Sequence, residues 1–153
     1  MNDATWADRA GVILDSYRRL LGRELIDRSG DAADDARRLF ALPKAVLAHD
    51  TGRPAILDWV NAAAAAAFDA APEALLGRPS ASTAPADAAP ERETLFVRLR
   101  ERGFVEGYSG VRVSLTGRRF VIADVTVFEL RDRDGRTAGH AAIIGATRPE
   151  SAR

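Results

Sequence analysis

The chain has 153 residues, no cysteine, and 22 basic side chains that balance 22 acidic ones. This length predicts one domain, while the lack of cysteine excludes a disulfide framework, a thiolate metal site and a cysteine nucleophile. Zero net charge argues against a nucleic-acid partner. No segment has the ~20 apolar residues that span a bilayer, and residues 1–6 lack signal-peptide features. We therefore expect a cytoplasmic protein that binds neither nucleic acid nor membrane.

The N-terminal part of the chain predicts two helices. Thr5 and Asp8 fit a capping box at the start of the first helix, and Gly30 is expected to end it. Asp31 can cap the second helix, which Pro43 stops. The first helix has an apolar stripe that is expected to cover a sheet or, secondarily, to pair with another copy, since it is under three heptads long. The stripe includes Leu14, Tyr17, Leu21 and Leu25.

The middle of the chain predicts two strands followed by helices. Residues 45–49 and 56–60 are short apolar segments with a turn around Gly52 and Pro54 between them. Asn61 follows the second segment directly and can cap the helix behind it. Helices are expected over residues 62–70, 72–76 and 91–102, with residues 79–90 as a loop.

The C-terminal third predicts three strands, over residues 108–115, 119–130 and 138–147. The second of these is apolar on both faces, which indicates a central strand covered on both sides. Asp132 and Gly135 mark a hairpin turn before the last strand. Gly103, Gly107 and Gly110 do not form a phosphate-binding loop, and we interpret them as a helix stop and turns.

Residues 56–77 combine a strand, an asparagine, an alanine-rich helix and a second short helix that closes on Leu-Leu-Gly. This order resembles the front half of a PAS domain, and residues 128–144 are similar to the last hairpin of that family. The resemblance covers about residues 45–147. It implies an α+β fold with a five-stranded antiparallel sheet of strand order 2-1-5-4-3, helices on one face, and the N-terminal helices packing outside.

A narrower resemblance covers nearly the whole chain. Residues 14–17, 21–25 and especially 102–112 (Arg-Gly-Phe-Val-Glu-Gly-Tyr-Ser-Gly-Val-Arg) are similar to MEKHLA domains, a PAS-related group of small bacterial and plant proteins. The resemblance implies a sensory or regulatory role, with no defined ligand or cofactor. The chain lacks the cysteine on which flavin photosensors of the PAS fold form their adduct. We expect three parts: a helical extension (1–44), a PAS-like domain (45–148) and a tail (149–153).

Aromatic residues are candidates for lining a ligand pocket, although a filled core uses the same residue types at the same positions. They are Trp59, Phe68, Phe96, Phe104, Phe120 and Phe128. A PAS-type pocket is a core that is incompletely filled, so the two interpretations are compatible. The alanine run 62–67 leaves space if neighbouring elements do not close in, and helix propensity alone also explains it.

Four polar residues are further candidates. Asn61 either contacts a pocket ligand or caps a helix, and the cap is favoured. Asp124 lies in the apolar run 121–127. It could be a buried pocket base, paired with Tyr108 or with an arginine such as Arg112. Alternatively it is exposed to solvent, and this second interpretation is favoured. His49 and His140 could each be a metal or haem ligand, a proton acceptor or a pH-sensitive group.

A structural role is favoured for both histidines. Haem-binding PAS proteins carry the iron ligand on the long helix before the third strand, and residues 91–102 contain no histidine. We therefore assign no metal and no catalytic residue, and the cofactor stays unknown.

The sequence thus predicts a stand-alone regulatory domain, not an enzyme. It would bind a small ligand or a partner protein, and it would signal by a shift in the packing of the sheet and the N-terminal helix. We see no output segment, so the signal would pass to a separate protein or within a dimer. The alternative is a small NTF2-like enzyme with His140, Asp124 and Tyr108 as its acid–base group. A third hypothesis is a pure interaction domain with a filled core.

Overall fold

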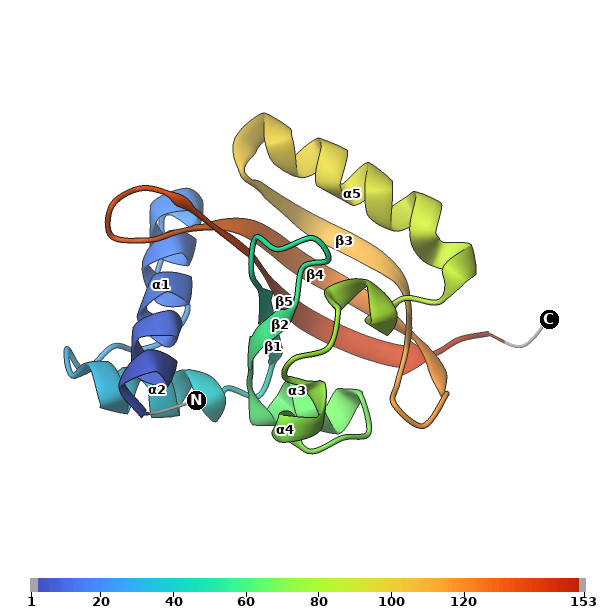
Figure 1. Ribbon diagram of the computed structural model, residues 1–153, viewed down its shortest axis with the longest axis horizontal. Helices are drawn as coiled ribbons and strands as arrows, with labels where there is room; N and C mark the ends of the chain where they lie inside the picture. The colour runs from blue at the N-terminus through green and yellow to red at the C-terminus, as the bar shows by residue number, and fades with distance from the viewer. Residues whose placement is uncertain (1–2, 152–153) are drawn as a thin grey trace.

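The computed structural model describes residues 3–151 (Figure 1). Two helices precede two short strands, a group of helices and three long strands, as the sequence predicts. The elements are α1 (Asp3–Leu21), α2 (Ala32–Phe40), β1 (Ala45–His49), β2 (Leu57–Val60), α3 (Ala62–Ala67), α4 (Pro72–Leu75), the 3₁₀ helices η1 (Ser80–Thr83) and η2 (Ala86–Ala88), α5 (Ala89–Arg102), β3 (Phe104–Val113), β4 (Arg119–Arg131) and β5 (Thr137–Pro149).

The five strands form one antiparallel sheet in the order β2-β1-β5-β4-β3, which confirms the expected topology. β1 pairs with β2 on one side and with β5 on the other, so strands from opposite ends of the fold lie side by side. In the β1–β5 pair, His49 lies directly opposite His140. The sheet order therefore brings the two histidines of the chain together.

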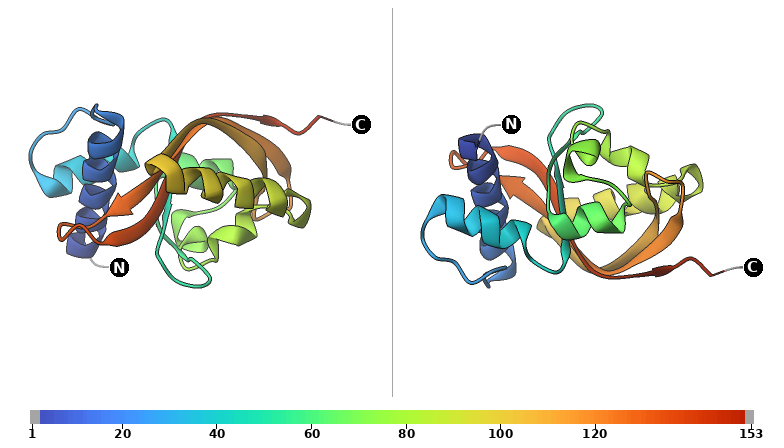
Figure 2. Two further views of the ribbon diagram at one scale, coloured as in Figure 1. Left: turned by 90° about the horizontal axis from the view of Figure 1, so that it is seen from above. Right: turned by 90° about the horizontal axis from the view of Figure 1, so that it is seen from below.

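The sheet is covered on both faces, and each face has its own hydrophobic core. α1 and α2 pack on the face that we call the outer face, whereas α3, α4 and α5 pack on the inner face (Figure 2). Because strand side chains alternate between the two faces, one strand contributes to both cores. In β5, Ile144 belongs to the inner core and Ile143 to the outer core.

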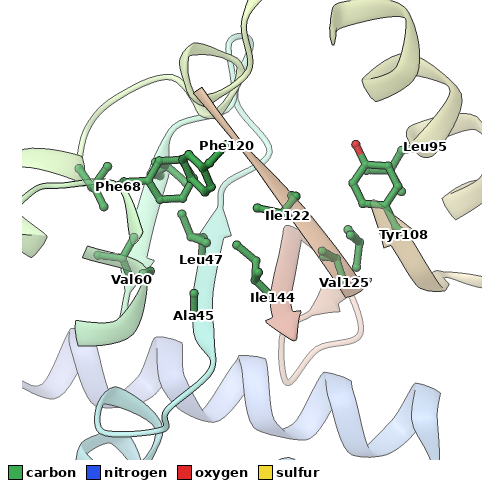
Figure 3. Close-up of a cluster of buried hydrophobic side chains, with 14 of the residues drawn as sticks. Ala45, Leu47, Val60, Phe68, Leu95, Tyr108, Phe120, Ile122, Val125 and Ile144 are labelled. Carbon is green, nitrogen blue, oxygen red and sulfur yellow. The ribbon is translucent and has the colours of Figure 1, made fainter. Parts of the chain in front are cut away.

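Aromatic contacts hold the helices on each face. On the outer face, Tyr17 of α1 packs edge-on against Phe128 with 5.4 Å between ring centroids. Trp6 stacks on Trp59 at 5.8 Å, and the indole N–H of Trp59 donates to the carbonyl oxygen of Trp6 (3.2 Å). On the inner face, Phe68 packs edge-on against Phe120 at 5.2 Å (Figure 3). The N-terminal helices thus pack outside the sheet, as expected.

The first helix is shorter than predicted. α1 ends at Leu21, because Gly22 adopts φ 74° and its amide donates to the carbonyl oxygen of Arg18 (2.9 Å). A glycine in the left-handed region ends the helix well before Gly30. The helix also already includes Asp3, so the predicted capping box at Thr5 is wrong. Leu25 lies beyond the helix, half-buried against the outer core.

The third strand begins earlier than predicted, at Phe104. Gly107 and Gly110 lie inside this strand, so their interpretation as turns is wrong. The pairing with β4 shifts register between Val105 and Tyr108 and again between Tyr108 and Gly110, which marks β-bulges. Gly107 has φ 68°, a conformation that favours glycine at a bulge. Residues 79–90, predicted as a loop, hold the two 3₁₀ helices and the start of α5.

Asn61 is fully buried at the junction between strand and helix. Its side-chain oxygen accepts hydrogen bonds from the amides of Ala64 and Val46, at 2.9 Å each. Its side-chain amide donates to the carbonyl oxygen of Lys44 (2.8 Å), with the carbonyls of Leu39 and Leu42 at 3.3 Å. The residue therefore caps α3 and also connects that helix to β1 and to the end of α2.

This network makes Asn61 a stability-determining residue. We expect Asn61→Ala to lower the free energy of unfolding by about 3 kcal/mol, because it leaves several buried backbone groups without partners. Urea unfolding followed by circular dichroism measures the change. Asp31 is the matched control: it caps α2 at the surface through a single bond to the amide of Asp34 (2.9 Å), so Asp31→Ala should cost only about 1 kcal/mol. Equal losses in the two variants would contradict the account.

Candidate functional site

A cavity of about 80 Å³ lies between the inner face of the sheet and α5. Apolar side chains of the sheet, including Ile122, Val125 and Ile144, form one part of its wall. The rest of the wall is unusually polar for the interior of a small domain. The polar and titratable residues are His49, Ser80, Thr83, Arg92, Tyr108, Arg112 and His140. Buried polar groups are unfavourable unless they find partners, so this cavity is the candidate functional site.

Three rings form a cluster at one end of the cavity, which we call the His–Phe cluster: His49, Phe96 and His140. Nε2 of His49 lies 3.2 Å from Nδ1 of His140. Phe96 of α5 stacks on His49 with 6.0 Å between centroids and meets His140 edge-on at 5.3 Å. All three also line an open depression beside residues 50–55, together with Arg92. The cluster therefore lies between the cavity and this depression.

Burial controls the charge of the two histidines. Burial, followed by the charges of His140 and Arg92, lowers the pKa of His49 to about 4. Burial also lowers the pKa of His140, against the opposing effect of Glu129. Both rings are therefore neutral at pH 7. Their short contact is a hydrogen bond when one ring nitrogen carries the proton and the other accepts it.

A second polar cluster stands at the other side of the cavity, on α5 and β3. The Tyr108 hydroxyl donates to Oε2 of Glu91 and accepts from Nη2 of Arg112 (2.9 Å). Burial and the bond to Glu91 raise the pKa of Tyr108 to about 12, so the phenol keeps its proton. A Cβ on residue 110 would collide with Oε1 of Glu91. Gly110 thus leaves the space that the Glu91 carboxylate occupies beside the backbone of β3.

Arg92 lies between the two clusters. Its Nη2 donates to the Ser80 hydroxyl (2.9 Å), and its guanidinium lies over the ring of Phe96, 4.9 Å from the centroid. Burial, followed by the charge of Arg112, lowers the pKa of Arg92. Within residues 3–151, no carboxylate lies at ion-pair distance from it. The side chain thus presents a positive charge at the cavity that no acidic residue neutralises directly.

Comparison with known families decides the identity of the fold. The family model of the MEKHLA domain matches residues 7–148. The chain belongs to the MEKHLA domain family. The match runs through the N-terminal helices as well as the sheet, so it includes α1 from Ala7 onward. No curated protein matches the chain.

Solved structures similar to this MEKHLA domain carry PAS and light-oxygen-voltage folds. A PAS domain from Colwellia psychrerythraea aligns with a TM-score of 0.63 and 14% identity, over 78% of this chain and 97% of its own. A light-oxygen-voltage domain studied with a flavin analogue gives 0.59 and 14%, over 76% and 84%. An RNA-binding light-oxygen-voltage receptor gives 0.62 and 18%, over 79% of this chain and 36% of the receptor. At these identities the likeness shows the fold, which is that of a PAS domain.

The MEKHLA domain places three of the predicted pocket residues on the cavity wall: Phe68, Phe96 and His140. Phe120 packs behind Phe68 in the inner core. Trp59 and Phe104 belong to the outer core instead, with Phe128. Their placement at the cavity is therefore wrong, because strand alternation turns these side chains to the other face of the sheet. Asn61 is the cap described above and does not line the cavity.

Asp124 is exposed, as favoured from the sequence, and it lies outside the cavity. Its φ of 52° places it at an irregular position of β4, opposite Gly145. The proposed acid–base group of Asp124, His140 and Tyr108 is therefore not assembled. The NTF2-like alternative fails on this geometry and on the strand order.

Sequence reasoning missed Arg92, Glu91 and Ser80. Arginine supplies nearly all the basic residues of the chain, so no single arginine stood out. Arg112 alternates with apolar residues in β3, a pattern that usually places the polar residue in solvent. In the structure Arg112 is buried and lines the cavity instead. Among residues 3–151, no group of three or more His, Asp or Glu side chains is arranged to hold a metal ion. The same part of the chain contains no helix that is long and apolar enough for a membrane span.

The histidine pair predicts a specific acid sensitivity. The unfolded chain protonates its histidines near pH 6.5, whereas folded His49 does so at about 4. The unfolded state thus binds more protons between these values, so stability is complete above pH 6.5 and falls as the pH drops toward 4. We expect His49 to account for a loss of about 3 kcal/mol across this window. Urea unfolding at pH 7.0, 5.5 and 4.5 measures it.

The matched control is the double variant His49→Gln and His140→Gln, which removes both titrating rings but keeps polar groups in the cavity wall. Its stability should stay nearly level between pH 7.0 and 4.5, because most carboxylates titrate below this range. A wild-type loss that the double variant reproduces in full would show that other groups cause it.

Proposed function

We propose that this MEKHLA domain is a sensory or regulatory module that binds a small molecule in the inner cavity and transmits its presence to the outer helices. The observation that carries the proposal is the polar wall of the cavity. A domain that only needed a filled core would have apolar side chains there, because buried polar groups without full solvation lower stability. The PAS-like sensory fold supports the same conclusion.

The size of the cavity limits the ligand. An apolar cavity of about 150 Å³ takes up benzene, and the cavity here has about 80 Å³. By this comparison it holds about three heavy atoms as it stands, and we expect side-chain adjustment on binding to extend this to about four to six. The three fused rings of a flavin do not fit this space, so the flavin named for one structural neighbour does not carry over to this chain.

A direct contact joins the cavity to the outer layer. Arg9 of α1 donates from Nη2 to the carbonyl oxygen of His49 (3.1 Å). The same guanidinium forms an ion pair with Asp58 of β2 (3.0 Å). We therefore expect a ligand that displaces the His49 ring to change how α1 packs against the sheet. Such a ligand shifts the population only if it binds one conformer more tightly than the other.

We infer that the output passes through the surface of α1. The stripe of α1 that faces the sheet is already used, since Leu14 and Tyr17 are buried in the outer core. A partner would therefore bind the solvent-facing side of α1, which carries Arg18 and Arg19. We infer no catalytic step, because the acid–base group weighed from the sequence is not assembled.

Filling the cavity should abolish binding. Ala142 lines the cavity from β5, and Ala142→Leu places three more carbon atoms in that space. We expect wild-type protein to give hits in a ligand-observed NMR screen of molecules with about four to six heavy atoms, and the variant to give none. The added bulk should cost about 1–3 kcal/mol of stability, which circular dichroism can verify.

The control is Ala146→Leu, the same change at an exposed position of β5. It should keep every hit. The proposal fails if wild-type protein gives no hit, or if Ala142→Leu keeps the hits that the wild type shows.

A further inference from the structure

The charges around the cavity do not balance. Arg112 has an acidic neighbour, since its Nη1 lies 3.5 Å from Oε1 of Glu91. Arg92 has none at ion-pair distance among the described residues. With the two histidines neutral, the wall of the cavity carries one excess positive charge. A small anion is the ligand that would neutralise it.

Both arginines keep hydrogen-bond donors for such a ligand. A guanidinium has five N–H groups in a planar fork. Arg92 uses one nitrogen on the Ser80 hydroxyl. Arg112 uses Nη1 on the carbonyl oxygen of Val111 (2.8 Å) and Nη2 on the Tyr108 hydroxyl (2.9 Å). The Tyr108 proton is directed to Glu91, so Tyr108 offers no donor to a ligand, whereas both arginines do.

The rest of the wall selects among anions. Ile122, Val125 and Ile144 give it an apolar part opposite α5. Figure 3 shows Tyr108 and Leu95 at one side of this apolar surface, with Ile122 and Val125 between them and the Phe68–Phe120 pair. A fully polar anion such as phosphate would leave oxygen atoms against these hydrocarbon groups without partners. An anion with one charged end and a short apolar tail matches both parts.

We propose that the cavity binds a short aliphatic monocarboxylate, with its carboxylate held by Arg92 and Arg112 and its tail against the apolar wall. The fork of a guanidinium matches the two oxygens of a carboxylate. With side-chain adjustment on binding, the cavity suits about four to six heavy atoms. This inference rests on the proposed function, since it names the ligand class of the same cavity.

The route into the cavity supports the same ligand. Arg92 lines both the cavity and the open depression beside residues 50–55. An anion that arrives from solvent therefore meets Arg92 before it passes the His–Phe cluster. Arg53, on the rim of the depression, adds a second positive charge there, with Asp50 as the acidic residue of the same rim.

Isothermal titration calorimetry at pH 7 tests the inference with sodium propionate, neutral propionamide of the same size, and sodium phosphate. We expect saturable binding of propionate, with propionamide and phosphate each at least tenfold weaker. Arg92→Gln should weaken propionate binding at least tenfold. Arg98→Gln, at an exposed arginine of the same helix, should leave it unchanged. The comparison of the three probes on the wild-type protein needs no variant, so it holds even if Arg92→Gln fails to fold.

Several outcomes would overturn the inference: propionamide or phosphate that binds as tightly as propionate, or a loss in Arg98→Gln equal to that in Arg92→Gln. If propionamide binds equally well and Ala142→Leu abolishes that binding, the carboxylate assignment fails while the cavity keeps its proposed function. If no probe binds the wild-type protein and the NMR screen also gives no hit, both proposals fail.

Discussion

The hydrogen-bond network of Asn61 is the constraint on which the rest of the molecule depends. One buried side chain caps α3, bonds to the first residues of β1, and donates to carbonyl groups at the end of α2. These three segments belong to both layers of the fold. Because every polar atom of the amide has a partner, the arrangement has little freedom to shift. The network thus fixes β1, which carries His49 to the cavity and Val46 to the outer core.

The sheet separates two cores of different character. The outer core is closed by aromatic contacts between α1, α2 and the strands. The inner core leaves a cavity, and the wall of this cavity includes two arginines, two histidines and a tyrosine beside its apolar residues. These groups weaken the inner core as a source of stability, and we propose that they recognise a charged molecule. The contact between Arg9 and the backbone of His49 joins the two cores at one point.

Much of this fold could be predicted from the sequence. The strand order followed from the resemblance of residues 56–77 and 128–144, and most element bounds fell within a few residues of those observed. Two of the errors share a physical cause. Gly107 and Trp59 are assigned from local patterns, but the conformation or facing of each depends on pairing with a distant segment. The early end of α1 has a local cause instead, since Gly22 and not Gly30 takes the left-handed conformation and bonds back to Arg18.

The candidate site was harder to predict than the fold. His49 and His140 are 91 positions apart, and only the register of β1 against β5 brings their rings within 3.2 Å. Arg92 looks like one more exposed arginine in a helix, because its position relative to Ser80 and Phe96 depends on how α5 crosses the sheet. Glu91 and Gly110 are linked only by the close approach of the helix to β3. No local pattern encodes such distances.

We propose that a small carboxylate binds between the sheet and α5 and changes how the first helix packs against the sheet. The most direct measurement follows the side-chain Nε–Hε signals of Arg92, Arg112 and Arg9 by NMR during a propionate titration. The account predicts that all three signals shift with the same saturation midpoint, the first two because they bind the carboxylate and Arg9 because its partner His49 moves. Unchanged Arg92 and Arg112 signals, with shifts spread over exposed arginines and no saturation, would contradict it.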